Sequence, residues 1–369
     1  MEVISLAAGT SYFKSPETAI DAAVQALEAG HTLYGPTEGT LALRETICRK
    51  YNLDGIDLSA SQVVVTPGTK QALFNLLTVL IQPNDEVVVP TPAWFGFHEL
   101  MRYSPGKLVP LPTHLQDGYK LSPEMLEATL TERTRILLLT NPGNPSGRLY
   151  SKTELEALLA VTNKYPNLYI ISDEIYDLIT YSRAFTTILS CEGAKASRTI
   201  IVNGFSKTFA MSGWRLGFII GPNDLVKKSI DFQGATFSGV SVFLQEAAKA
   251  AIELGSAHLA LQKDVLTRNR EIMRQGLEAI PNVRFYLPDG AYYFFPDLSD
   301  YLGHTSISGE QIRTTDDLCR YFRSCYNLEL ASGDLFGAPG HVRMSFAVEP
   351  HRLQDAMQRL RQGLLLLTA

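Results

Sequence analysis

Between residues 60 and 221, short apolar runs alternate with stretches patterned for helices. Runs such as "QVVVT", "RILLLT" and "LYIIS" carry no alternating polar side chains, so both faces of each predicted strand must be covered. Helices are expected over residues 69–82 and 93–103 and in "SKTELEALLAVTNKY". This alternation predicts an α/β fold whose large domain has a mostly parallel central sheet covered by helices.

The pattern changes after about residue 275. "VRFYLPDGAYYFFPDL" is typical of antiparallel strands around a turn, and a helix is expected over residues 315–326. The apolar segment "HVRMSFA" and a closing helix from Pro350 follow. We expect a smaller α+β domain built from both termini, with residues 1–32 and 276–369, and a large domain of residues 33–275.

Composition excludes several classes of function. The chain has 369 residues, 45% of them hydrophobic, which is typical of a folded protein. A formal charge of −5 gives no support to a nucleic-acid groove, and no apolar run is long enough to span a membrane. The start "MEVISLAAGT" does not resemble a secretory signal, so a cytoplasmic location with reduced thiols is expected. The seven histidines and four scattered cysteines lack metal-ligand spacing, so no metal site is expected.

The unusual polar residues lie where the predicted strands end. These ends are "TPGTKQA", "TPAW", "TNPGNPSG", "SDEIYD" and "NGFSKT". Ligands of open parallel sheets bind at the carboxyl ends of the strands. The sequence therefore predicts a ligand site at this edge.

Two of these ends allow more than one interpretation. Gly68, Thr69 and Lys70 begin a predicted helix, whose free N–H groups could bind a phosphate or simply be capped. Asp173 and Glu174 could be solvated acids, or they could belong to the metal-binding strand of a nucleotide triphosphatase. That second interpretation needs a GxxxxGK[ST] loop, and "GFSKT" lacks the glycine before its lysine.

Lys207 lies between two apolar runs, where an unpaired ammonium is costly. A Schiff base between this lysine and an aldehyde cofactor removes most of the cost. Pyridoxal phosphate would also explain the neighbouring motifs, because its phosphate needs an anion site, its ring nitrogen a carboxylate and its phenolate hydrogen-bond donors.

"SKTFAMSGWRLGF", "NPGNPSG" and "SDEIY", taken together, resemble the class I/II aminotransferases of the aspartate aminotransferase superfamily, which are fold type I pyridoxal-phosphate enzymes. The resemblance runs from "LAAGTSYF" to "HVRMSFA", nearly the whole chain. It implies that Lys207 carries pyridoxal 5'-phosphate and moves the substrate proton. Asp173 would pair with the ring nitrogen, and Tyr176 and Asn144 would hold the phenolic oxygen.

The same resemblance implies the remaining ligands. The phosphate would be held by Gly68, Thr69, Lys70, Ser206 and Arg215. Trp94 would stack on the cofactor ring. Both Trp94 and Asn144 would also contact the substrate. Gly9 and Arg343 would bind the α-carboxylate of the substrate, Arg343 as a bidentate fork.

"YGPTEGTLALRE" resembles the family segment whose tyrosine, here Tyr34, reaches the phosphate in the neighbouring subunit. A homodimer with composite sites is therefore implied. The sequence also departs from the family pattern. The N-terminal arm is short, which puts a lid in doubt, and Gly234, Ala235 and Gly239 replace a more usual Ser/Thr-rich run.

The resemblance implies ping-pong transfer of an amino group from an amino acid to a 2-oxo acid. Arg102 occupies the place of a lysine that meets the distal carboxylate in relatives acting on aspartate or prephenate, so aspartate or glutamate is favoured. Arg102 could equally face solvent, which leaves aromatic and aliphatic donors open. A fold type I lyase or decarboxylase remains an alternative. A non-catalytic regulator is disfavoured because no residues are left for a DNA-binding domain.

Overall fold

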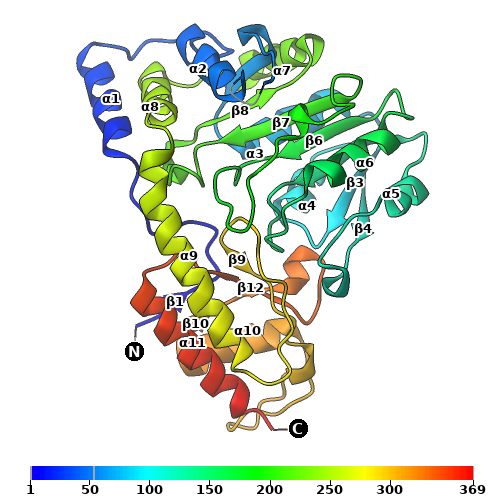
Figure 1. Ribbon diagram of the computed structural model, residues 1–369, viewed down its shortest axis with the longest axis vertical. Coiled ribbons are helices and arrows are strands. Elements are labelled where there is room, and N and C mark those ends of the chain that lie inside the picture. The colour runs from blue at the N-terminus through cyan, green and yellow to red at the C-terminus, as the bar shows by residue number, and fades with distance from the viewer. Residues whose placement is uncertain (1, 53–54, 369) are drawn as a thin grey trace.

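A computed structural model describes residues 2–52 and 55–368 and has an upper and a lower part in Figure 1. The upper part is built on one sheet with the strand order β2-β8-β7-β6-β5-β3-β4. Its strands are β2 (Val63–Thr66), β3 (Glu86–Thr91), β4 (Lys107–Pro112), β5 (Thr134–Thr140), β6 (Tyr169–Asp173), β7 (Arg198–Gly204) and β8 (Gly217–Ile220). β8 is antiparallel to both neighbours, whereas the other adjacent pairs are parallel. The predicted mostly parallel sheet is confirmed.

Helices cover both faces of this sheet, as the continuous apolar strands require. Val64 packs on one face with residues of α3 (Thr69–Leu80), α4 (Gly96–Met101) and α7 (Asn223–Thr236). Val63 and Val65 point the other way, into a second cluster. That cluster includes residues of α1 (Glu17–Glu28), α2 (Leu41–Asn52), α5 (Pro123–Thr129), α6 (Lys152–Thr162) and α8 (Val242–Glu253).

The lower part is the predicted smaller α+β unit, and both ends of the chain lie in it (Figure 1). Its strands are β1 (Ile4–Ser5), β9 (Tyr293–Phe294), β10 (Leu328–Glu329), β11 (Ala331–Ser332) and β12 (Val342–Ser345). The order β11-β12-β9 is antiparallel, and β1 pairs in parallel with β10. Its helices are α10 (Thr315–Tyr326) and α11 (Pro350–Leu365), and the long α9 (Ser256–Glu278) runs down to it from the upper part.

Two details differ from the expected pattern. Residues 283–286 form no strand, and only an isolated bridge joins Arg284 to Asp297. The N-terminal segment contributes β1 to the lower part, but α1 lies against α8 in the upper part. The proposed limits of the large and small domains stay at residues 33–275 and 276–369, but the segment 1–32 is divided between the two parts instead of belonging to the small domain alone. Short 3-10 helices complete the fold: η1 (Ala60–Gln62), η2 (Leu115–Asp117), η3 (Ile188–Ser190), η4 (Ser212–Trp214), η5 (Ser299–Tyr301) and η6 (Gly333–Phe336).

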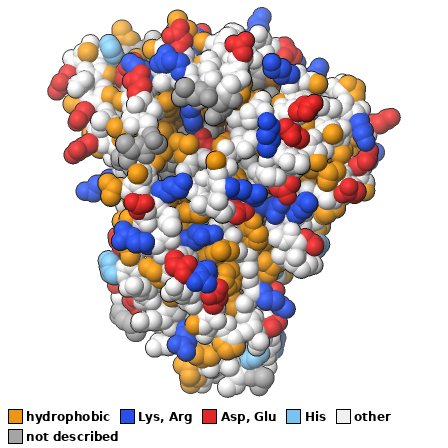
Figure 2. Space-filling model, viewed as in Figure 1, with side chains coloured by type: hydrophobic (Ala, Val, Ile, Leu, Met, Phe, Trp, Pro, Cys, Tyr) orange, Lys and Arg blue, Asp and Glu red, His pale blue; other side chains and the backbone are white. Residues whose placement is uncertain are grey.

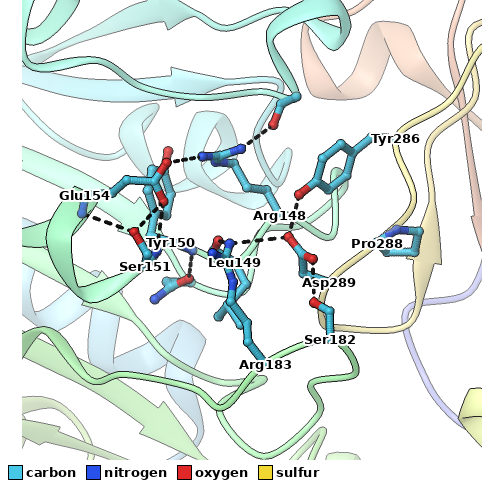
Figure 3. A network of polar contacts seen from close by, with 12 residues as sticks. Arg148, Leu149, Tyr150, Ser151, Glu154, Ser182, Arg183, Tyr286, Pro288 and Asp289 are labelled. Carbon is cyan, nitrogen blue, oxygen red and sulfur yellow. Dashed lines mark hydrogen bonds and ion pairs between the residues drawn. The ribbon is translucent and has the colours of Figure 1, made fainter.

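The loop between α9 and β9 is fastened to the upper part by the polar network in Figure 3. The Asp289 carboxylate accepts hydrogen bonds from the hydroxyls of Tyr286 and Ser182, the latter at 2.6 Å. The Asp289 backbone N–H donates to the Gly147 carbonyl oxygen at 2.9 Å. The bonds to Ser182 and Gly147 hold the loop against the upper part, whereas the sequence predicted that strand pairing would order this segment.

Charged side chains of both signs are spread over the face drawn in Figure 2. Lysine and arginine side chains gather at the level where the upper and lower parts meet. Within residues 2–52 and 55–368, no helix is both long and apolar enough to cross a bilayer.

Candidate active site

A cavity of about 780 Å³ is lined by residues of the upper sheet and of the lower part. Most of the residues that the sequence singled out meet there. The predicted site residues in its lining are Gly9, Thr69, Lys70, Trp94, Asn144, Asp173, Tyr176, Ser206, Lys207, Arg215 and Arg343.

Strand direction explains this convergence. β2, β3, β5, β6 and β7 all end at the same edge of the sheet, so the loops after them meet there. Asp173 is the last residue of β6, and Lys207 follows the end of β7. β8 runs in the opposite direction and begins at this edge, which places Arg215, just before it, in the same lining.

The Lys207 ammonium donates a hydrogen bond to the Gly9 carbonyl oxygen. The same oxygen accepts from the Tyr292 hydroxyl at 2.9 Å and the Tyr293 hydroxyl at 3.4 Å. The Tyr293 hydroxyl also lies 3.0 Å from that of Tyr176. Gly9, which was expected at the substrate carboxylate, is thus hydrogen-bonded to Lys207. Tyr292 and Tyr293 were not identified from the sequence.

Asp173 is a buried acid without a strong cationic partner. Its side chain is 6% exposed, and one carboxyl oxygen accepts a long hydrogen bond of 3.4 Å from the Ile175 N–H. Burial raises the pKa of Asp173 to about 7, although that N–H and then the charge of Lys207 act in the opposite direction. A protonated ring nitrogen is the partner that this carboxyl needs, so the residue fits the expected cofactor.

Arg343 is a buried guanidinium with a donor to spare. It is 4% exposed and donates to the Asn144 side-chain oxygen at 3.1 Å and to the Ala7 carbonyl oxygen at 2.7 Å. Its buried Nε has no hydrogen-bond partner among the described residues. The guanidinium carbon lies 4.5 Å from the ring centre of Tyr293 and 4.8 Å from that of Phe336. The two terminal nitrogens each have a second N–H, and a carboxylate in the cavity could accept from these.

The N-terminus of α3 forms the other end of the cavity. Gly68 precedes the helix with φ 84°, and no side chain caps the free N–H groups. A Cβ atom at Gly68 would stand 2.3 Å from a guanidinium nitrogen of Arg215, so the glycine allows the arginine to approach. Helix N–H groups, the hydroxyls of Thr69 and Ser206 and this guanidinium make a cradle suited to a phosphate.

Three predicted residues are not part of the cavity lining: Gly68, which directly precedes the lining residue Thr69, and Arg102 and Tyr34, which face solvent. The Arg102 side chain is 73% exposed and forms an ion pair of 3.5 Å with Glu99, because it sits at the end of α4 and faces solvent. Tyr34 is 96% exposed. Lys70, which the sequence assigned to the phosphate through its backbone, places its ammonium 5.2 Å from the ring centre of Trp94 in the cavity lining.

The cavity and the fold together define a class of protein. Residues 1–360 match the model of the aminotransferase class I and II family, and the chain belongs to that family. It is 36% identical, over 98% of its length and 77% of the relative's, to a bifunctional aspartate aminotransferase and glutamate/aspartate-prephenate aminotransferase of Petunia hybrida.

Two solved structures share the fold over nearly the whole chain. The aspartate aminotransferase of Rhizobium meliloti matches with a TM-score of 0.95 and 33% identity, covering 100% of this chain and 92% of the other. An aromatic aminotransferase of Pyrococcus horikoshii matches with a TM-score of 0.91 and 32% identity, covering 98% of this chain and 96% of the other. The architecture therefore defines the class of enzyme, and its substrate has to be argued from the site.

Proposed function

We propose that this protein is a pyridoxal-phosphate-dependent aminotransferase that moves the amino group of aspartate or glutamate to a 2-oxo acid, donor and acceptor using the site in turn. The observation that carries the proposal is the convergence of Lys207, Asp173 and Arg343 on one cavity. An amine, a buried acid and a guanidinium with a free donor are the three groups that this reaction requires.

The cavity residues fit the cofactor. The start of α3, Ser206 and Arg215 would hold its phosphate, and Trp94 would cover its ring. Asp173 would pair with the ring nitrogen, and that cation would draw the raised pKa of the carboxyl down. Tyr176 would donate to the phenolic oxygen, as would Asn144.

The bound cofactor supplies an aldehyde that takes up the amino group and a ring that withdraws electrons from the substrate Cα. Arg343 binds the α-carboxylate and orients the Cα–H bond toward Lys207. The Lys207 amine removes the proton from Cα and returns it as general acid. Gly9, whose carbonyl oxygen binds Lys207, would give up this bond when the lysine is engaged in catalysis.

Preference for an acidic donor requires a second cation. Arg102 points to solvent, Arg343 serves the α-carboxylate and Arg215 serves the phosphate. Lys70 is the remaining cation of the described lining that no other ligand needs. We therefore assign the side-chain carboxylate of the donor to Lys70.

We also propose a homodimer with composite sites. Leu33 and Tyr34 are 81% and 96% exposed, and apolar residues of α1 (Ile20, Val24 and Leu27) are exposed as well. Exposed apolar side chains gathered in one segment favour a covered interface. Tyr34 lies outside the lining of its own cavity, in agreement with a role in the partner's site. The cytoplasmic location stays a prediction.

The purified protein tests the proposal directly. Borohydride should fix the cofactor on Lys207, as peptide mapping would show, and a label elsewhere would contradict the assignment. Adding aspartate or glutamate alone should convert the aldehyde form of the cofactor to the amine form. A lyase or decarboxylase would regenerate the aldehyde, so persistence of the aldehyde absorption during product release would favour that alternative.

A further inference from the structure

Asp177 is a buried acid that lines no part of the catalytic cavity. Its side chain is 4% exposed, and it follows Tyr176 in the loop after β6. Tyr176 lines the cavity, whereas Asp177 lies among residues of α2 and of the segment after β7. The proposed function leaves this acid without a role.

Both carboxylate oxygens of Asp177 are occupied by donors. One accepts from the Lys50 ammonium at 2.5 Å and from the Asn203 side-chain amide at 2.9 Å. The other accepts from the Thr208 hydroxyl at 3.2 Å and the Leu178 N–H at 2.9 Å. Four donors therefore converge on the two oxygens, and the Lys50 ammonium compensates the charge of the buried carboxylate.

These bonds enclose the turn that carries Lys207. Asn203 lies before the lysine and Thr208 directly after it, so a single carboxylate holds the chain on both sides of Lys207. Asp177 itself belongs to the loop after β6, which starts beside Asp173 and carries Tyr176. Its carboxylate therefore connects the loop after β6 to the turn after β7 on the side away from the cavity.

We propose that Asp177 is a positioning residue that fixes Lys207 relative to Asp173, with Lys50 as the counter-ion of its carboxylate. The inference rests on the proposed function of Lys207. Without this carboxylate the turn after β7 loses its side-chain anchors, and the lysine amine samples positions away from the reacting carbon. A displacement of about 1 Å can cost about 100-fold in rate.

The experiment compares Asp177→Asn with Asp85→Asn in the full-length chain. Asp85 is also a buried acid of the upper part, paired with Arg135 at 3.1 Å, but it precedes β3 at the opposite edge of the sheet. Both variants should lower the Tm. With the cofactor removed, the rate at which added pyridoxal phosphate and borohydride label Lys207 should fall about 10-fold or more in Asp177→Asn only. In the loaded enzyme, kcat should fall far more than KM rises.

Thr208 provides a milder test in case Asp177→Asn does not fold. Thr208→Val keeps the shape but removes the hydroxyl donor, so it should slow labelling and turnover about 3- to 10-fold. Thr208→Ser should restore both. The proposal is overturned if Asp177→Asn, or Thr208→Val in its place, labels and turns over like Asp85→Asn. Wild-type protein that is not labelled at Lys207 would instead overturn the proposed function.

Discussion

The guanidinium of Arg343 donates a hydrogen bond of 3.1 Å to the side-chain oxygen of Asn144 across the boundary between the two parts of the molecule. Arg343 belongs to β12 in the lower part, and Asn144 to the loop after β5 in the upper part. The bond joins the proposed α-carboxylate clamp to a proposed ligand of the cofactor. Movement of the lower part against the upper part would therefore change the positions of the carboxylate-binding arginine and of the cofactor-binding asparagine together.

Replacing Arg343 should lower the catalytic efficiency for every amino donor to a similar extent. Arg343→Lys keeps the charge but cannot serve Asn144, Ala7 and a carboxylate from one planar group. We expect kcat/KM to fall about 10- to 200-fold for all amino donors, the loss of one charge-assisted hydrogen bond of about 1.5–3 kcal/mol. Steady-state kinetics would show this. Arg352→Lys is the matched control, because this partly buried arginine of the same part lies outside the cavity lining and pairs with Glu2, and it should change kcat/KM little.

Asp173 should make the stability of the cofactor-free protein depend on pH. Its pKa is raised to about 7 in the folded chain from 3.8, so the unfolded chain loses its proton first. Below about pH 4 the carboxyl is protonated in both the folded and the unfolded chain. Between about pH 4 and about pH 7 only the folded chain keeps the proton, so the free energy of unfolding falls as the pH rises through this range. Asp173→Asn lacks this titration.

Chemical unfolding at pH 5 and pH 8 would measure the effect. The variant should gain on the order of 2–3 kcal/mol relative to wild type between these two pH values, since one pKa unit corresponds to about 1.4 kcal/mol. Saturating cofactor should reduce the difference because a bound ring cation stabilises the carboxylate. A constant difference across the pH range would mean that Asp173 is ionised without a partner.

The strand-end residues could be predicted because order along a parallel sheet brings consecutive loops to one edge. Asp173 and Lys207 follow from the ends of apolar runs. Contacts between distant segments could not be predicted in this way: Tyr292 meets Gly9 across 283 positions, and no local pattern signals it. Arg102 is expected at the distal carboxylate because it occupies the place of a lysine in some relatives, but α4 ends at Met101 and the arginine lies beside Glu99 at the surface.

The composite site can be tested by mixing variants. Lys207→Ala lacks the proposed amine, and Tyr34→Ala removes the side chain that we assign to the partner's phosphate. A hybrid dimer would contain one site with Lys207 from one chain and Tyr34 from the other. Its activity should exceed that of both parents after subunit exchange.

Arg343→Ala is the control for this mixture. Arg343 and Lys207 line the same cavity within one chain, so mixing Lys207→Ala with Arg343→Ala should restore an intact site on the second protomer only if one of them acts across the interface. We expect no recovery from that pair. Lack of recovery from the Tyr34 pair, with exchange demonstrated, would mean that each protomer has a self-contained site.

The last prediction concerns the choice of donor. Lys70 and Trp94 both line the cavity. Among the described residues, the Lys70 ammonium forms no salt bridge with a carboxylate. Lys70→Met retains much of the side-chain length and removes the charge. Aspartate and glutamate should lose about 10- to 200-fold in kcat/KM, because their second carboxylate loses a charge-assisted hydrogen bond of about 1.5–3 kcal/mol.

Alanine and phenylalanine should be nearly unaffected by Lys70→Met, since they offer this cation nothing to bind. The matched variant Arg102→Met should leave all four donors unchanged, because that side chain is 73% exposed and turned to Glu99. The affinity for pyridoxal phosphate, measured separately, distinguishes loss of a substrate contact from loss of the cofactor. An equal loss for all four donors at full cofactor occupancy would assign Lys70 to the common reaction, and selective loss in Arg102→Met would return the acidic preference to α4.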